Sequence, residues 1–393
     1  MTYPERFSNL PPYAFPRLRT LLSGLEPGGS PVDMTIGSPL HPFPRWITDI
    51  IADSSDGFGG YPPNDGTPEL RGAISDWIQW RYGVDYDADS QIMPLNGTRE
   101  GLFNASLALC PETKGGAKPV ILTPNPFYQV YAVAALAVNA DPVYVPATVE
   151  TGFLPDFRAL SKDILNRTAV CYICSPSNPQ GAVASKAYWA DLIALAEEYD
   201  FTIFADECYS EIYRQSQPVG ALTVAAEVGA DPERLMLFNS LSKRSNLAGL
   251  RSGFAASGPQ NITRMKSLRA YAGAPLALPL QRVAEKIWAD EDHVEANRAL
   301  YREKLDFADS LFDGVQGFTA PEAGFFLWLP VSNGEEATKT LWTEVGVKVL
   351  PGAYLGRDAM GGNPGDQYIR AALVAPMNEL QPGLQALKNC IYG

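Results

Sequence analysis

The stretch SLSKRSNLAGLRSG, residues 240–253, places a lysine among small and polar residues, with Arg251 eight positions beyond Lys243. It follows the apolar run LMLF at residues 235–238, which is typical of a strand. A lone lysine in a loop is usually a solvated charge. A lysine that leaves a strand end for a cleft is instead suited to covalent chemistry, and Lys243 is the first candidate residue.

Such a lysine can form a Schiff base with an aldehyde cofactor such as pyridoxal phosphate (PLP). The protonated pyridine nitrogen of PLP requires a carboxylate against it. Asp206 in FADECY ends an apolar run, where an unpaired charge would be costly and a cationic ring nitrogen would offset that cost. The alternative is that Asp206 caps a helix or pairs with an arginine.

The phenolate oxygen of PLP requires hydrogen-bond donors, and its ring accepts a stacked aromatic side chain. Tyr209 follows Asp206 by three residues, and Asn178 lies in SPSNPQG. Tyr128 in NPFYQVY is a candidate for the stacking partner. Taken alone, Asn178 before a proline is typical of a turn and Tyr128 of a core.

The phosphate of PLP requires an anion site. Gly97, Thr98 and Arg99 come directly before a helix with apolar periodicity, where free N–H groups and the helix dipole favour an anion. Ser240 and Arg251 flank the lysine and offer a hydroxyl and a positive charge to the same group.

The elements around these residues predict how they come together. Between residues 65 and 285, short apolar runs such as PVILTPNP, AVCYICSPSNP and FTIFADECY alternate with helical segments. Strands that are apolar on both faces indicate a mostly parallel sheet covered by helices on both sides. Ligands of such sheets bind beyond the carboxyl ends of the strands, where Asn125, Asn178, Asp206 and Lys243 fall. A long helical stretch over 279–312 then leads into a mixed α/β tail, which we expect to be a smaller second domain.

Composition excludes several classes of protein. The chain has 393 residues and a formal net charge of −13, which disfavours nucleic-acid and anionic-membrane partners. We find no signal peptide and no apolar stretch long enough for a bilayer, and predict a cytoplasmic protein. With two histidines and five scattered cysteines, the sequence offers little for a histidine triad or a metal site. The CxxC pair Cys171 and Cys174 lies in an apolar run, which indicates buried thiols, and we read His41 as a turn residue.

Together these motifs resemble the fold-type I, class I/II PLP-dependent aminotransferases, and the resemblance covers essentially the whole chain. SLSKRSNLAGLRSG is similar to that family's lysine motif, SPSNPQG to its asparagine motif, ADECY to its Asp-x-x-Tyr motif and GGYPPNDGTPELR to its tyrosine–glycine–leucine–arginine stretch. The resemblance implies a three-layer α/β/α large domain over residues 46–284. It also implies a smaller α/β domain formed by both chain ends, with an N-terminal arm over 1–45 and a C-terminal part over 285–393.

The resemblance also implies a role for each candidate residue. Lys243 would carry PLP and move the proton between the substrate α-carbon and the cofactor carbon, while Asp206 would hold the ring nitrogen. Arg370 in QYIRAAL would grip the substrate α-carboxylate, with the Gly37 backbone and Asn178. Tyr61 would reach the phosphate of a neighbouring subunit, which implies a homodimer with shared active sites. The remaining roles are phenolate donors (Tyr209, Asn178), ring stacking (Tyr128) and phosphate binding (Gly97, Thr98, Arg99, Ser240, Arg251).

The chain departs from the family pattern at Gln180, where threonine is commoner, and at Cys208, where valine or isoleucine is commoner. We expect neither to touch a functional role. Within the family, the motifs look most like N-succinyldiaminopimelate aminotransferases of lysine biosynthesis, which implies ping-pong amino transfer from N-succinyl-L,L-diaminopimelate to 2-oxoglutarate. A PLP-dependent β-lyase would keep the same cofactor residues. A non-catalytic PLP-sensing regulatory domain is a second alternative, disfavoured by the acidic charge and by the lack of a basic DNA-binding module before the fold.

Overall fold

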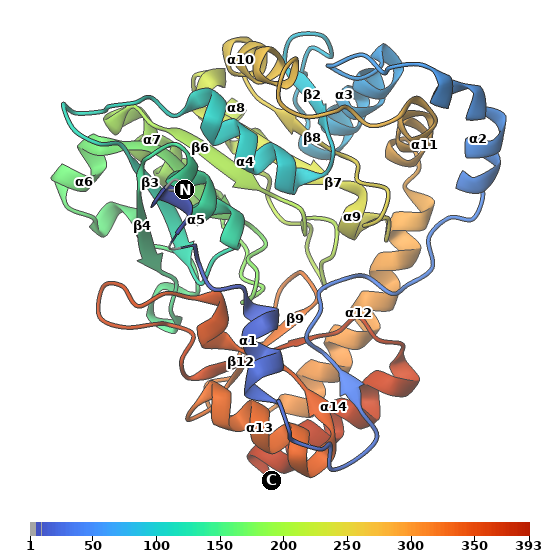
Figure 1. The fold of residues 1–393 in the computed structure, drawn as a ribbon, viewed down its shortest axis with the longest axis vertical. Coiled ribbons are helices and arrows are strands. Elements are labelled where there is room, and N and C mark those ends of the chain that lie inside the picture. Colours follow the sequence, from blue (N-terminus) through green and yellow to red (C-terminus); the bar gives the residue numbers. More distant parts are fainter. Residues whose placement is uncertain (1–4, 9) are drawn as a thin grey trace.

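Apolar runs form the strands of a seven-stranded sheet in the spatial order β2-β8-β7-β6-β5-β3-β4 (Figure 1). The computed structural model describes residues 5–8 and 10–393; residues 1–4 and 9 of the predicted N-terminal arm lie outside the described residues. β8 runs antiparallel to both its neighbours, and the other paired strands are parallel, so the predicted mostly parallel sheet is confirmed. The strands are β2 (Ile92–Leu95), β3 (Val120–Asn125), β4 (Asp141–Pro146), β5 (Thr168–Cys174), β6 (Thr202–Asp206), β7 (Leu235–Ser240) and β8 (Gly253–Ala256).

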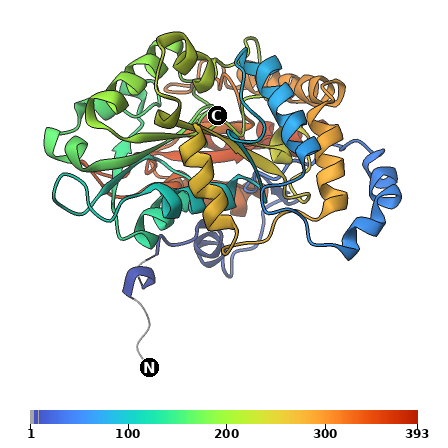
Figure 2. The same ribbon diagram turned by 90° about the horizontal axis from the view of Figure 1, so that it is seen from above.

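Both faces of this sheet are buried under helices, as Figure 2 shows from above. In β5 the alternation is direct: Cys171 and Ile173 pack into one apolar core and Val170 and Tyr172 into the other. The first core lies under α2 (Ile47–Asp53), α3 (Pro68–Tyr82), α6 (Lys162–Arg167), α7 (Lys186–Tyr199), α8 (Ala221–Val228) and α11 (Leu278–Trp288). The second lies under α4 (Thr98–Leu109), α5 (Gln129–Ala137) and α10 (Pro259–Arg269).

A second, smaller sheet is formed by three strands from the C-terminal part of the chain. It has the antiparallel order β11-β12-β9, with β9 (Phe326–Pro330), β11 (Leu350–Pro351) and β12 (Tyr368–Ala372). Beside it, β1 (Val32–Asp33) pairs in parallel with β10 (Val347–Lys348). The surrounding helices are α1 (Ala14–Leu21), α12 (Asp292–Phe312), α13 (Gly334–Val345) and α14 (Met377–Tyr392). The predicted domain boundaries at residues 45 and 284 stay a prediction.

The helix ends follow local sequence signals. The Thr67 hydroxyl accepts from the Leu70 N–H at the start of α3, and Gly83 ends the same helix in the left-handed conformation at φ 69°. Ser185 caps α7 in the same way, with its hydroxyl accepting from the Tyr188 N–H.

Short 3-10 turns connect the elements: η1 (Glu5–Phe7), η2 (Ser55–Gly59), η3 (Val149–Thr151), η4 (Phe157–Ala159), η5 (Pro232–Arg234) and η6 (Gly352–Leu355).

The long helical stretch predicted over 279–312 is two helices, α11 and α12, that meet at residues 289–291. The Asp290 carboxylate accepts from the Asp292 N–H and lies 2.9 Å from His293 Nδ1, so this side chain bonds the first turn of α12 and favours a break after α11. The break lets α12 leave the large sheet and run down to the small one (Figure 1). Among the described helices, none is long and apolar enough to cross a membrane.

Candidate active site

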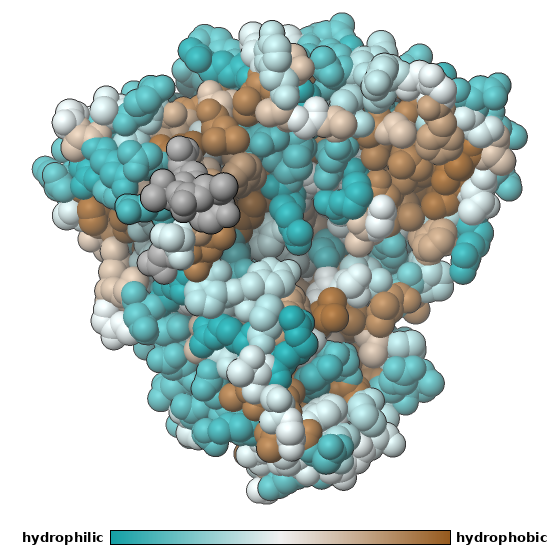
Figure 3. All heavy atoms as spheres, viewed as in Figure 1, coloured by the Kyte–Doolittle hydropathy of each residue, from teal (hydrophilic) through white to brown (hydrophobic). Residues whose placement is uncertain are grey.

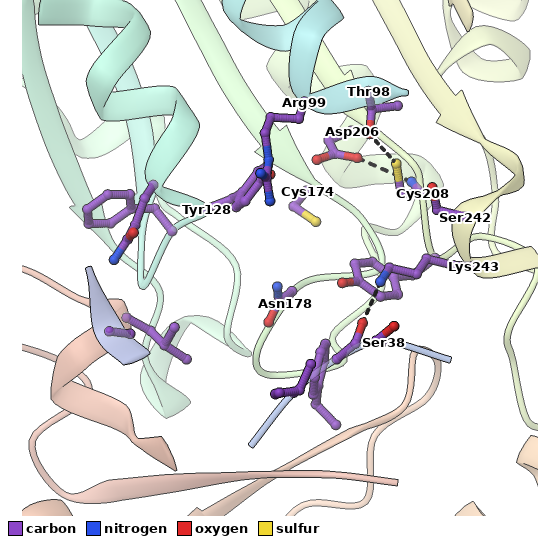
Figure 4. Close-up of a pocket in the computed structure, with 18 of the residues that line it drawn as sticks. Ser38, Thr98, Arg99, Tyr128, Cys174, Asn178, Asp206, Cys208, Ser242 and Lys243 are labelled. Atoms are coloured by element: carbon purple, nitrogen blue, oxygen red, sulfur yellow. Dashed lines mark hydrogen bonds between the residues drawn. The ribbon is translucent and has the colours of Figure 1, made fainter. Parts of the chain in front are cut away.

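A cavity of about 390 Å³ lies where the carboxyl ends of the parallel strands face the small sheet and the N-terminal segment. Figure 4 shows its polar side chains converging from several elements: Asp206 from the end of β6, Lys243 after β7, and Asn178 in the loop after β5. Strand ends of a parallel sheet are where such sheets bind ligands. The predicted candidates that line this cavity are Gly37, Thr98, Arg99, Tyr128, Asn178, Asp206, Tyr209, Ser240, Lys243, Arg251 and Arg370.

Lys243 lies in α9 (Leu241–Arg244), a single helical turn that follows β7. Its amine donates to the Gly37 carbonyl oxygen at 2.5 Å and lies 5.4 Å from the centre of the Phe325 ring. Burial lowers the pKa of this amine to about 8, and the Arg370 and Arg251 guanidinium groups act in the same direction. A neutral, nucleophilic amine is therefore accessible near physiological pH.

The Asp206 carboxylate is buried with only 5% exposure. It accepts a hydrogen bond from the Tyr131 hydroxyl at 2.7 Å and one from the Cys208 N–H at 3.3 Å. Within the described residues no arginine, lysine or histidine forms an ion pair with it, and burial raises its pKa. A buried carboxylate with only neutral donors is suited to accept a cation from a ligand.

The Arg370 side chain comes from the middle of β12, where burial lowers its pKa to about 10. Its Nη2 donates to the Thr35 carbonyl at 2.7 Å and its Nη1 to the Asn178 side-chain oxygen at 3.1 Å. The guanidinium lies 4.2 Å from the centre of the Phe326 ring, and its buried Nε has no hydrogen-bond partner in the described structure. An orphaned donor on a buried guanidinium indicates a site for an anionic ligand group.

Thr98 and Ser240 converge on one sulfur atom. The Thr98 hydroxyl lies 3.2 Å and the Ser240 hydroxyl 3.7 Å from Cys208 Sγ (Figure 4 draws the first contact). Thr98 is the first residue of α4, and Gly97 caps that helix at φ 78°. A Cβ at Gly97 would lie 2.2 Å from Arg251 Nη2, so the guanidinium packs directly over the helix start. This arrangement gathers the donors that an anion needs.

The remaining candidates have different surroundings. Arg99 Nε donates to the Tyr128 hydroxyl at 2.6 Å, which ties both side chains to the wall of the cavity. The Tyr209 ring packs edge-on against Phe325, and burial raises its pKa. Tyr61 does not line the cavity and is fully exposed, with a relative exposure of 103%. Asn125 is bonded through its side chain to the Arg357 backbone and braces that loop.

Two residues of the site escaped the sequence analysis. Tyr131 was not singled out from the sequence, although it follows Tyr128 by three residues and the two rings pack edge-to-face with 5.7 Å between their centres. The expectation that Cys208 touches no functional role was wrong, because its thiol and N–H contact Thr98, Ser240 and Asp206. Cys208 follows Asp206 by two residues, which was the signal available. Cys174 also lines the cavity, and the described residues contain no cluster suited to a metal ion.

Comparison with known proteins defines the class of the chain. The family model "Aminotransferase class I and II" matches residues 30–384, so the chain belongs to this family. It is 31% identical to an LL-diaminopimelate aminotransferase of Dehalococcoides mccartyi, over 99% of both chains. An aminotransferase structure from Neisseria meningitidis is 37% identical with a TM-score of 0.93, over 98% of this chain and 99% of that one. A probable N-succinyldiaminopimelate aminotransferase from Thermus thermophilus is 25% identical with a TM-score of 0.83, over 96% and 98% of the two chains.

The protein is therefore a PLP-dependent aminotransferase, and the predicted fold class, enzyme class and cofactor are confirmed. The residues present fit PLP. The buried Asp206 carboxylate has no ion-pair partner in the described structure and would match a protonated ring nitrogen. The Gly97 position leaves no room for a Cβ beneath Arg251, as expected of a close-fitting phosphate site.

Proposed function

We propose that this protein transfers the amino group of a diaminopimelate-type donor to 2-oxoglutarate, with Lys243 as the cofactor lysine and catalytic base. The observation that carries the proposal is that the Lys243 amine, the buried Asp206 carboxylate and the buried Arg370 guanidinium line one cavity. Amino transfer needs these three groups: an amine that can gain and lose a proton, a carboxylate that stabilises a cationic ring, and a grip on the substrate carboxylate.

Lys243 would hold PLP and then exchange a proton at the substrate α-carbon. Bound PLP supplies an electron-accepting ring that stabilises negative charge at that carbon. Because its pKa is lowered to about 8, the Lys243 amine can exist both neutral, as a base, and protonated, as an acid, near neutral pH. The Gly37 carbonyl orients the amine, and Phe325 screens it from water on one side.

Four groups of side chains would bind and orient the cofactor around that lysine. Asp206, held by Tyr131, would pair with the ring nitrogen. Tyr209 and Asn178 would donate to the phenolate oxygen and Tyr128 would stack on the ring. The phosphate would be bound by Gly97, Thr98, Ser240 and Arg251, with Cys208 packed between the hydroxyls of Thr98 and Ser240. Arg99, which donates to Tyr128, would lie at the margin of this phosphate site.

Arg370 would bind the α-carboxylate shared by amino donor and oxo-acid acceptor. Thr35 and Asn178 hold two of its nitrogens, and the unpartnered Nε leaves a donor for the substrate. Burial against Phe326 strengthens the ion pair that forms, since little water competes for the charges.

The proposed donor is supported by two of the relatives. One is named for LL-diaminopimelate and the other, as a probable enzyme, for N-succinyldiaminopimelate, so both names share the same carbon skeleton. The sequence motifs favour the succinylated form. Either donor would place the enzyme in lysine biosynthesis.

The proposal is tested by a panel of donors with purified, PLP-loaded protein. N-succinyl-L,L-diaminopimelate, L,L-diaminopimelate, aspartate and aromatic amino acids are each supplied with 2-oxoglutarate, and glutamate is measured. We expect at least one diaminopimelate donor to exceed the others in kcat/KM by about 100-fold or more, and Lys243→Ala to abolish turnover. A β-lyase would release pyruvate from a cysteine conjugate without an oxo acid, and preference for aspartate or an aromatic donor would contradict the assigned substrate.

We further propose a homodimer in which Tyr61 completes the partner's phosphate site. Tyr61, Tyr271 and Phe58 expose large aromatic surfaces, with relative exposures of 103%, 94% and 57%. Figure 3 displays a hydrophobic area over α2 and α11. Exposed aromatic residues of this kind mark protein interfaces.

A further inference from the structure

The segment of residues 35–43 passes the active site without any backbone–backbone hydrogen bond in the described structure. Side chains hold its carbonyl groups instead. Arg370 donates to the Thr35 carbonyl at 2.7 Å, Lys243 to that of Gly37 at 2.5 Å and Asn246 to that of Pro42 at 3.2 Å. The position of this segment therefore depends on hydrogen bonds from side chains. Two of these side chains, Lys243 and Arg370, are the proposed catalytic and substrate-binding groups.

The segment also contributes a side chain of its own, His41, which contacts α12. Its Nε2 lies 2.6 Å from Lys304 Nζ, and its Nδ1 lies 2.9 Å from the Asn297 side-chain oxygen. Its ring lies against Tyr301, with 4.3 Å between ring centres. Asn297, Tyr301 and Lys304 follow one another at spacings of four and three residues, so they form one face of α12.

The hydrogen bonds of Asn297 determine the tautomer of His41. The Asn297 amide nitrogen donates to the carbonyls of Lys243 and Arg244, at 3.3 and 3.2 Å. Its oxygen accepts from the Asn246 side chain at 3.0 Å and therefore also faces His41. His41 Nδ1 must then carry the hydrogen and donate, which leaves Nε2 as an acceptor for Lys304.

The positive charge of Lys304 also favours a neutral His41 whose Nε2 accepts a hydrogen bond. Lys304 is 2% exposed and its other acceptor is the Val374 carbonyl at 3.3 Å; in the described structure it forms no ion pair. A second positive charge on His41 would face the ammonium directly, at high cost in a buried site. Burial and the neighbouring Lys304 both lower the pKa of His41, which favours the neutral imidazole.

We propose that His41 and Lys304 are positioning residues: their hydrogen bond, tied through Asn297 to the backbone of Lys243, fixes segment 35–43 so that its carbonyls orient Arg370 and the Lys243 amine. The kinetic part of this proposal rests on the proposed function. Lys243 and Arg370 must exchange partners during turnover when they engage cofactor and substrate. The bond between His41 and Lys304 takes no part in that exchange and holds the segment throughout.

The first test compares steady-state kinetics of the PLP-loaded variants His41→Phe and Lys304→Met with the wild-type protein. Phe keeps a ring against Tyr301, and Met keeps an unbranched stem. Lys304→Met therefore removes the bond to His41, whereas His41→Phe removes that bond and the bond to Asn297. Losing one such bond is expected to raise KM for both donor and 2-oxoglutarate about 5- to 20-fold, with kcat changed less than about 3-fold. The double variant is expected to add little to the effect of His41→Phe, because that single change already removes the bond to Lys304 together with the bond to Asn297.

The matched control is His293→Phe. His293 is the second of the two histidines and contacts Ser245 and Asp290 near the same lysine, yet in the described structure it forms no hydrogen bond with segment 35–43. We expect its KM values to stay near those of the wild type. Unchanged KM values in His41→Phe and Lys304→Met, or an equal rise in His293→Phe, would overturn the positioning role.

The second test does not depend on activity. With two histidines, ¹⁵N-labelled imidazoles give two sets of NMR signals, assigned with His41→Phe. We expect His41 to be protonated on Nδ1 and unprotonated on Nε2, and to titrate at higher pH in Lys304→Met because a neighbouring cation is removed. A proton on Nε2, or an unchanged titration, would refute the bond. If no amino donor reacts with an oxo acid, the proposed function fails. The NMR spectrum then tests by itself whether His41 and Lys304 form the hydrogen bond.

Discussion

Asp206 and Lys243 illustrate how burial tunes single residues of the site. Burial favours the uncharged form of each, so it raises the pKa of the Asp206 carboxyl and lowers that of the Lys243 amine to about 8. Under the proposed function both shifts suit PLP binding: the amine would be ready to react, and the carboxylate would gain a favourable partner in a cationic ring.

Replacing Asp206 tests whether its carboxylate contributes to PLP binding and turnover. We expect Asp206→Ala to weaken PLP binding about 10-fold or more and to lower kcat by at least about 100-fold, because the ring nitrogen loses its counter-charge. Absorbance titration of the apo-protein and single-turnover kinetics measure both effects. Tyr131→Phe is the control, since it removes one hydrogen bond from Asp206 but keeps the charge; near-normal kinetics of Asp206→Ala would exclude the carboxylate from the mechanism.

The lowered pKa of Lys243 predicts a pH dependence. The neutral amine reacts, so the rate of PLP capture by the apo-protein is expected to rise about 10-fold per pH unit below 8 and to level off above it. Stopped-flow absorbance gives the rate, and borohydride trapping with peptide mass analysis identifies the lysine. A rate that continues to rise beyond pH 10 would indicate an ordinary lysine, and a label elsewhere would refute the site.

At the scale of elements, the site combines strand ends and one helix start of the large sheet with Arg370 from the middle of β12, and this explains what the sequence could predict. The strands that precede Asp206 and Lys243 were recognisable because each is a short apolar run, buried on both faces. Tyr131 was not recognisable as a site residue, because α5 is apolar nearly all round and its sequence does not tell which face meets Asp206. The role of His41 depends on Asn297 and Lys304, more than 250 residues away, and local sequence carries no signal of such contacts.

The start of α4 provides a prediction at this scale. Gly97→Ala is expected to weaken PLP binding about 10-fold or more, because the new methyl group would strain a left-handed φ and displace Arg251. Gly83→Ala is the matched control: its φ is 69°, but no heavy atom lies within 4 Å of its Cβ position. Both variants should lower Tm, and only Gly97→Ala should change the PLP affinity in a titration; equal affinities would show that Arg251 does not bind the phosphate.

At the scale of the whole molecule, the exposed Tyr61 predicts that each active site needs two chains. Tyr61→Ala and Lys243→Ala are expected to be strongly impaired alone. After mixing under conditions that allow exchange, random pairing should restore about a quarter of the wild-type activity, because each mixed dimer contains one intact site. Activity that stays at the level of the separate variants, with mixed dimers verified by mass spectrometry, would place Tyr61 outside the partner's site.

The pairing of β1 with β10 has a consequence for how the protein is made. Val32 meets Val347, so the strand that leads into segment 35–43 has no partner until more than three hundred further residues have been synthesised. A nascent chain on the ribosome can thus complete the large sheet while the proposed catalytic lysine, Lys243, still lacks a segment 35–43 that is held in place by β1. We expect chains that stop before β10 to be inactive even with a folded large sheet, because β1 would lack its partner and segment 35–43 would lose that support.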